Sequence, residues 1–218
     1  MGAMTRLDSV NQMLLYAGES IVSDLDNASG VDTSIAEFLL DQKTMDYQER
    51  GLASNQRMER ISPSADGRIK IRTDAISVTM DNPPASTDDG PLQGEPSRIV
   101  TRGGYLYNLT DDTDYFDPTE TFDLIYVLKI DWEDMDTPIQ KAIVMQAARE
   151  YQMLSQGDPA ADQYLAGLEA VYGAKAKGRD AKNRDASILR NGDSAIQRIL
   201  YGRNMAFDPN RYRRYNGG

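Results

Sequence analysis

Residues 98–109 read Arg-Ile-Val-Thr-Arg-Gly-Gly-Tyr-Leu-Tyr-Asn-Leu, two runs rich in β-forming residues joined by a pair of glycines. Isoleucine, valine, threonine and tyrosine favour strands, and glycine adopts the positive φ angles that a two-residue hairpin turn demands. These residues are therefore predicted to form an antiparallel hairpin that turns at Gly103 and Gly104. The hairpin is the clearest local signal in the sequence, and it assigns the middle of the chain to antiparallel β structure.

Further strands are expected on both sides of the hairpin. Residues 68–80 alternate apolar and polar side chains with a period of two, which is typical of half-buried strands. The apolar positions in this stretch are Ile69, Ile71, Ile76, Val78 and Met80. Residues 122–130 are apolar on both faces, which predicts a central strand. Residues 81–97 hold four prolines and are expected to form a long loop.

Two helices are predicted before the β region. Thr5 and Asp8 have the spacing of a capping box, and the helix that they begin ends at Gly18. A second helical pattern covers residues 32–51. Its predicted apolar stripe consists of Ile35, Phe38, Leu39, Gln42 and Met45.

Two more helices are predicted after the β region. Thr137-Pro138-Ile139-Gln140 combines an N-cap residue, a proline at the first helical position and a capping-box glutamine. The apolar stripe of this helix is Ile139, Ala142, Ile143, Ala147, Tyr151 and Leu154. Asp158-Pro159 begins the last helix in the same way. Its apolar face is Ala161, Leu165, Leu168 and Tyr172.

Together these elements predict an α+β chain. Each helix has only one apolar stripe, so the N-terminal and C-terminal helices must pack together as a bundle, with the antiparallel β region inserted between them in the sequence. We expect residues 5–67 and 137–191 to supply the bundle, residues 68–131 to form the β insertion, and residues 192–218 to form an extended basic arm.

The chain of 218 residues contains no histidine and no cysteine. This composition removes the nucleophile systems that need these residues, all thiolate and imidazole metal sites, and every disulfide. No catalytic, cofactor-binding or metal-binding residue is predicted. A glycosidase needs only two carboxylates, so a carbohydrate hydrolase stays open as an alternative. Its candidate acids are Glu120, Asp131, Glu133 and Asp134.

The net charge of −10 conceals a division of charge along the chain. Residues 1–174 sum to −17 and residues 175–218 to +7, so an acidic body carries a basic tail. Such an asymmetry is typical of an interaction arm. The expected partner-binding residues are Lys175, Lys177, Arg179, Arg198, Tyr201, Arg203, Arg211, Tyr212, Arg213 and Arg214. No apolar run is long enough for a membrane span and no signal peptide is apparent, so synthesis in a cytoplasm is the default expectation.

Several short motifs carry a resemblance to a known family. They are Val10-Asn11, Leu14, Gly18-Glu19, Arg102-Gly103-Gly104-Tyr105-Leu106-Tyr107-Asn108, Tyr115-Phe116-Asp117, the strand Leu124 to Ile130, Asp134-Met135, Pro138, Ala148-Arg149 and Gln152. In these motifs the chain resembles the tail tubular protein A family, the head-to-tail adaptors of short-tailed, podovirus-type bacteriophages. The similarity covers most of residues 5–155, and the Arg-Gly-Gly-Tyr hairpin is its most specific part.

The resemblance implies a structural virion protein without enzymatic activity or a cofactor. Twelve copies would form a ring in the tail at the portal vertex, after synthesis in the host cytoplasm. The ring would join the portal protein to the tail nozzle protein, of the tail tubular protein B type. Double-stranded DNA would pass through its channel without sequence-specific binding during genome ejection.

An acidic turn follows the hairpin, and its carboxylates are expected to line this channel or to face the nozzle. They are Asp111, Asp112, Asp114 and Asp117. A negative wall, repeated around a ring, would repel phosphate. Two alternatives stay open: a carboxylate-dependent carbohydrate hydrolase associated with a phage tail, and the head-tail connector of a long-tailed phage.

Overall fold

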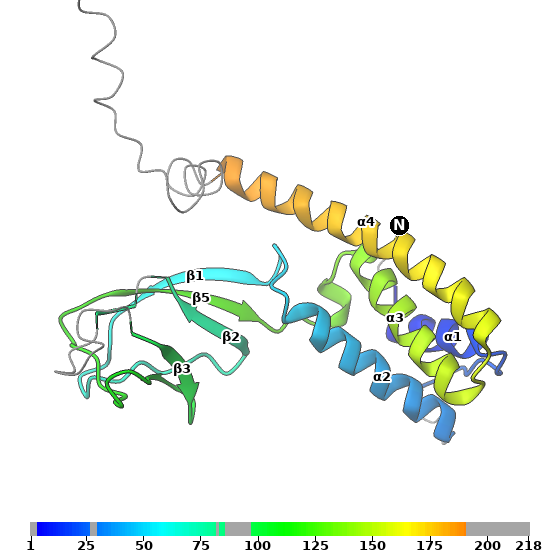
Figure 1. Ribbon diagram of the computed structural model, residues 1–218, viewed down its shortest axis with the longest axis horizontal. Helices are drawn as coiled ribbons and strands as arrows, with labels where there is room; N and C mark the ends of the chain where they lie inside the picture. Colours follow the sequence, from blue (N-terminus) through cyan, green and yellow to red (C-terminus); the bar gives the residue numbers. More distant parts are fainter. Residues whose placement is uncertain (1–3, 27–29, 82, 86–96, 191–218) are drawn as a thin grey trace, which may run out of the picture. The chain divides into compact units, whose positions relative to one another are not determined.

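A computed structural model describes residues 4–26, 30–81, 83–85 and 97–190, with the backbone alone over 185–190 (Figure 1). Its elements are α1 (Arg6–Tyr16), α2 (Val31–Gln48), β1 (Gln56–Ile61), β2 (Ala75–Met80), β3 (Ile99–Arg102), β4 (Tyr105–Asn108), β5 (Phe122–Leu128), a 3-10 turn (Trp132–Asp134), α3 (Thr137–Ser155) and α4 (Pro159–Arg190). The α+β prediction is therefore confirmed. Residues 1–180 form one compact unit, to which the following description applies, and residues 181–218 form a second.

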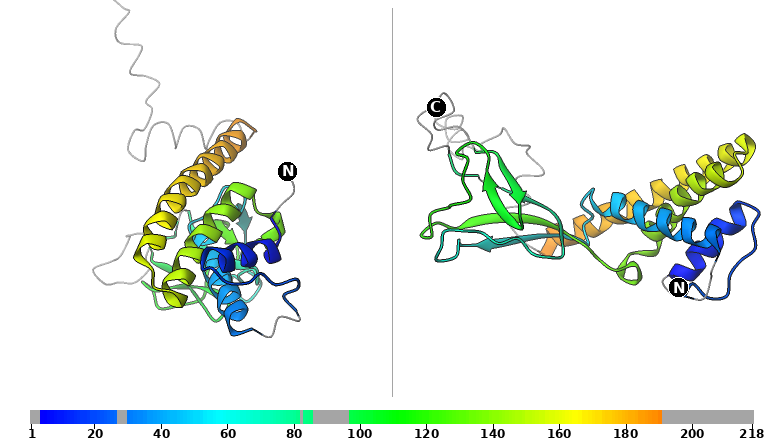
Figure 2. Two further views of the ribbon diagram at one scale, coloured as in Figure 1. Left: turned by 90° about the vertical axis from the view of Figure 1, so that its right-hand side faces the viewer. Right: turned by 90° about the horizontal axis from the view of Figure 1, so that it is seen from below.

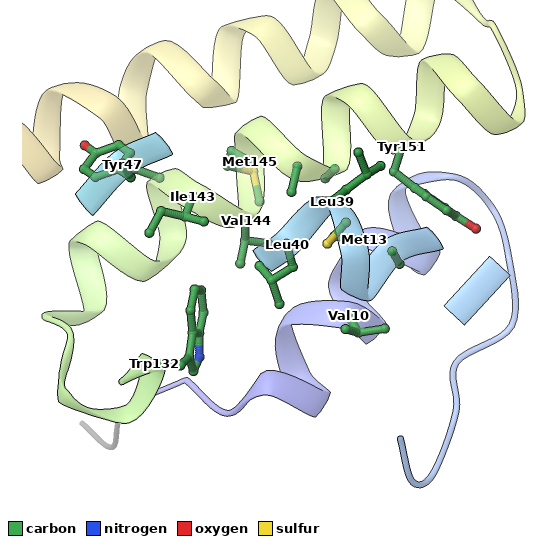
Figure 3. Packing of buried hydrophobic residues seen from close by; sticks show 14 of the residues in the cluster. Val10, Met13, Leu39, Leu40, Tyr47, Trp132, Ile143, Val144, Met145 and Tyr151 are labelled. Carbon is green, nitrogen blue, oxygen red and sulfur yellow. The ribbon is translucent and has the colours of Figure 1, made fainter. Parts of the chain in front are cut away.

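Helices α1, α2 and α3 pack against one another and enclose the larger of two cores (Figures 1 and 3). Val10 and Met13 of α1 meet Leu39 and Leu40 of α2 and Val144 of α3 in this core. The predicted capping box of α1 is present, because the Asp8 amide donates to the Thr5 hydroxyl at 3.0 Å and the Asp8 carboxylate accepts from the Thr5 amide.

The apolar stripe predicted for α2 is partly wrong. Leu39 is buried, but Ile35, Phe38 and Gln42 are exposed to solvent. The buried positions of α2 are Thr33, Ala36, Leu39, Leu40, Tyr47 and Gln48. Because α2 contacts both α1 and α3, the side with the small residues Thr33 and Ala36 faces the core, where it allows close approach of the helices.

The start of α3 differs from the prediction in its capping. Asp136 is the N-cap, the helix begins at Thr137, and neither a side-chain cap nor a capping box is formed. Gln140 instead turns into the core. Most of the predicted stripe is buried, but Leu154 is exposed because it lies in the last turn of the helix, beyond the residues that pack on the core.

Helix α4 begins at Pro159, and its predicted apolar face packs against the bundle. Leu165 is buried, and Leu168 and Tyr172 pack half-buried against the core, together with the fully enclosed Ala176. Arg149 of α3 holds the two helices together, since its guanidinium donates to Asp162 at 2.6 Å.

The strands form two antiparallel sheets (Figures 1 and 2). The three-stranded sheet has the order β1-β5-β2, so β5 is the central strand, as predicted from its apolar residues. Strand β1, with the sequence Gln-Arg-Met-Glu-Arg-Ile, was not expected, since it shows no apolar alternation. It is an edge strand whose side chains are exposed or half-buried.

The hairpin is confirmed as β3 and β4. Arg102 pairs with Tyr105, and the turn glycines Gly103 and Gly104 have φ angles of 60° and 82°, the signature of a type I′ turn. Residues 68–72 form no full strand, contrary to the prediction. Only an isolated bridge joins Lys70 to Tyr105, although the predicted alternation still buries Ile69 and Ile71 in the second core.

Two buried glutamine side chains hold the segments that connect the β region to the helices. The Gln48 side chain accepts from the Ile130 amide at 2.8 Å and donates to the Ile130 carbonyl at 3.0 Å. Gln140, fully buried, donates to the Trp132 carbonyl at 2.7 Å and accepts from the Met4 amide at 3.1 Å. These bonds satisfy backbone groups that secondary structure leaves without partners.

We expect Gln140→Leu to lower the free energy of unfolding by about 2 kcal/mol, because the Met4 amide and the Trp132 carbonyl lose a buried partner. Urea denaturation followed by circular dichroism measures this. Gln163→Leu, at an exposed position of α4, is the matched control and should change stability little. Equal losses in the two variants would contradict the role of Gln140.

Candidate functional site

The charged and apolar surfaces of this protein carry its candidate sites. Among the described residues, no three histidine, cysteine or acidic side chains are grouped to hold a metal ion. No helix in the described part of the chain is long and apolar enough to cross a membrane. The basic and acidic residues that the sequence singled out are therefore the candidates for function.

The basic residues of α4 differ in their contacts: two lysines are exposed, and one arginine is paired with a carboxylate. Lys175 and Lys177 are exposed, with the Lys175 ammonium 4.9 Å from the centre of the Tyr172 ring. Arg179 donates to Asp136 at 2.9 Å, and this hydrogen bond raises the pKa of Arg179. The other predicted partner-binding residues lie outside the described part of the chain: Arg198, Tyr201, Arg203, Arg211, Tyr212, Arg213 and Arg214. The lysines are thus accessible to a partner, whereas Arg179 also has a structural role.

A charged pocket lies between α2, α3 and α4, but its side chains satisfy one another. Arg149 donates to Asp162 at 2.6 Å and to Glu169 at 3.1 Å, and Lys43 of α2 pairs with Glu150 at 2.6 Å. The hydrogen bond from Arg149 lowers the pKa of Asp162. Such a closed set of ion pairs joins helices and leaves little unbalanced charge for a ligand.

The acidic turn after the hairpin is built around Asn108, which is buried at the end of β4. Its side-chain oxygen accepts from the Thr110 amide at 3.0 Å and from the Asp111 amide at 3.3 Å, and its side-chain nitrogen donates to the Asp111 carboxylate at 2.8 Å. Asp112 follows with a φ angle of 50° and accepts from the Tyr107 hydroxyl at 2.6 Å. That bond raises the pKa of Tyr107.

The remaining two acids of the turn also have local partners. Asp114 pairs with Arg68 at 3.0 Å. Asp117 accepts from the Thr119 amide at 2.9 Å and from its hydroxyl at 2.8 Å, and these bonds lower the pKa of Asp117. Asp112 and Asp117 are exposed, whereas Asp111 and Asp114 are half-buried. The predicted acids thus lie in one ordered turn.

Sequence reasoning did not assign a positioning role to the residues that hold these acids. Asn108, Arg68 and Thr119 each bind one of the four carboxylates. A signal for Asn108 was present, since asparagine two or three residues before a turn commonly bonds the backbone ahead of it. The pairing of Arg68 with Asp114 joins residues far apart in the sequence, so local pattern does not predict it.

Comparison with known proteins gives the family. The sequence matches the family model described as tail tubular protein over residues 7–185, most of the chain. This protein belongs to the tail tubular protein family. A curated relative of this tail tubular protein is tail tubular protein A of Klebsiella phage KP34, 30% identical over 132 residues. The alignment covers 61% of this chain and 63% of the relative, which is less than two thirds of the relative's length.

The family membership confirms the resemblance noted in the sequence. Tail tubular proteins are structural, so this chain is a structural component of a phage tail and not an enzyme. The hydrolase alternative, with Glu120, Asp131, Glu133 and Asp134 as candidate acids, is therefore set aside. The function of this chain is therefore expected to depend on its surfaces and not on a catalytic pocket.

We expect Asn108→Ala to loosen the acidic turn, because the Thr110 and Asp111 amides lose their acceptor. The local free energy of opening should fall by about 1 to 2 kcal/mol. Hydrogen exchange of residues 109–113 measures this. Thr121→Ala, at an exposed position before β5, serves as the control and should leave exchange in the turn unchanged. Unchanged exchange in Asn108→Ala would show that the turn holds without this side chain.

Proposed function

We propose that this tail tubular protein is a ring-forming adaptor that joins the capsid portal to the tail nozzle and forms part of the channel for genome ejection. The observation that carries the proposal is the family match, which extends through both the helical region and the β region. The name of the relative, tail tubular protein A, supports a place in the tail tube. In this proposal the ring has twelve copies, as the resemblance implies.

The basic C-terminal segment is proposed to bind the portal or a neighbouring subunit. Residues 175–218 sum to +7, in contrast to −17 for the preceding residues. Lys175 and Lys177 are exposed at the start of this segment and form no ion pair among the described residues. A cluster of exposed cations favours an acidic partner surface and accelerates association with it.

The acidic turn is the proposed DNA-facing or nozzle-facing element. Its local hydrogen bonds hold the carboxylates in place, and the lowered pKa of Asp117 keeps this group negative well below neutral pH. Repeated around a ring, the turn would present a negative wall to the phosphate backbone. DNA would then slide without adhering, because the excess of carboxylates in the turn repels its phosphate groups.

Removal of residues 192–218 tests whether the basic C-terminal segment binds these partners. We expect the shortened chain to keep its helical content and melting temperature but to lose attachment to purified portal, as seen by sedimentation and electron microscopy. Lys177→Glu should weaken attachment in the full chain, whereas Lys129→Glu, an exposed charge reversal after β5, should not. A shortened chain that still attaches to portal and still assembles into rings would refute the assignment to this segment.

A DNA-binding assay tests whether the acidic turn repels DNA in the proposed channel. The assembled protein should not retain double-stranded DNA at moderate salt, because its acids repel phosphate. Asp112→Lys with Asp117→Lys should increase retention by about tenfold or more, since each added cation releases counterions on binding. Glu133→Lys, an exposed charge reversal outside the turn, is the control. Tight DNA binding by the unaltered assembly would overturn the sliding proposal.

A further inference from the structure

Two helices of the compact unit expose large apolar side chains that no other described element covers. On α2, Val31 and Phe38 are 72% and 67% exposed, with Ile35 between them. On α4, Tyr164 and Val171 are 62% and 50% exposed. We call these the α2 face and the α4 face. Contiguous exposed apolar groups of this kind mark interaction sites.

The α2 face lies away from the core that its helix helps to form, and the α4 face lies beside the residues of α4 that pack on the core. On α2 the core side is marked by Ala36 and Leu40, both fully buried. On α4 the core side is marked by Leu165 and Ala176. Both helices therefore have a second apolar side beyond the one that the bundle uses, which a helix of an isolated globular unit does not need.

The two faces continue into groups of opposite charge with the same spacing. On α2, Met45 follows Phe38 after seven residues and Glu49, the C-cap residue, follows after four more. On α4, Val171 follows Tyr164 after seven residues and Lys175 follows after four more. Both series have the period of one helix side. Glu49 and Lys175 are exposed, and neither forms an ion pair with another described residue.

Helices α2 and α4 also run in the same direction. Helix α3 is antiparallel to α4, because Arg149 meets Asp162 near one end while Asp136 meets Arg179 near the other. It is antiparallel to α2 as well, because Lys43 of α2 pairs with Glu150 near the end of α3, whereas Gln48, the last residue of α2, binds Ile130 in the segment that leads into α3. In a ring of many copies, successive copies differ by a small rotation, so α2 of one copy would lie nearly parallel to α4 of the next.

We propose that the α2 face of one copy docks on the α4 face of the neighbouring copy. In parallel register, Phe38 lies against Tyr164, Met45 against Val171, and Glu49 pairs with Lys175. The two faces are different surfaces of one chain, so the contact is head-to-tail and propagates into a ring instead of stopping at a dimer. This inference rests on the proposed ring and names the surfaces that would build it.

Site-specific cross-linking tests the pairing, and the absence of cysteine from the chain makes introduced thiols unique. An equimolar mixture of Phe38→Cys and Tyr164→Cys chains, treated with a short bifunctional maleimide, should give covalent dimers. Neither variant alone should do so. Met58→Cys, an exposed apolar position on β1, replaces Phe38→Cys in the control mixture and should give background yield. Dimers of Phe38→Cys alone, or none in the mixture, would overturn the pairing.

Charge reversal tests the register. Glu49→Lys in the Phe38→Cys chain should reduce the dimer yield several-fold at low salt, and Lys175→Glu in the Tyr164→Cys chain should restore it. Lack of restoration would overturn the register. Sedimentation of the unaltered chain distinguishes failure of the α2–α4 interface from failure of the proposed adaptor function. Closed rings without cross-links would refute this interface and leave the adaptor function standing, whereas a chain that stays monomeric and does not bind portal would refute both.

Discussion

Half-buried backbone groups around Ile130 impose the constraint on which the rest of the compact unit depends. The chain leaves the central strand β5 here and must enter α3 within a few residues, so its peptide groups lack regular partners. Gln48 supplies both a donor and an acceptor to Ile130, and Gln140 performs a similar role for Trp132 and Met4. Because buried polar groups without partners are costly, these amide side chains determine where the strand can meet the helices.

The packing of α2 follows from that constraint. With Gln48 directed at Ile130, the side of α2 that faces α1 and α3 carries Thr33, Ala36 and Leu40, and the larger Phe38 turns outward. The exposed apolar face is therefore a consequence of how the helix is anchored. In a structural component of a phage tail, such an exposed apolar face is available for contact with another subunit.

Charge is organised differently in the two regions. Among the helices, Arg149 and Lys43 bind their acidic partners closely and stabilise the bundle. In the β region, the acids after the hairpin are held by neighbouring residues such as Asn108 and remain near the surface. The helical region thus uses much of its charge in ion pairs between helices, whereas two acids of the turn, Asp112 and Asp117, are exposed to solvent.

The sequence by itself determined the elements whose causes are local: the type I′ hairpin at Gly103 and Gly104, the central strand and the capping box of α1. Only the tertiary structure decided the edge strand β1, the buried side of α2 and the use of Gln140. The reason is physical. Turn geometry and strong apolar runs act over a few residues, whereas the side of a helix that is buried depends on neighbours more than eighty residues away, as Gln48 and Ile130 are.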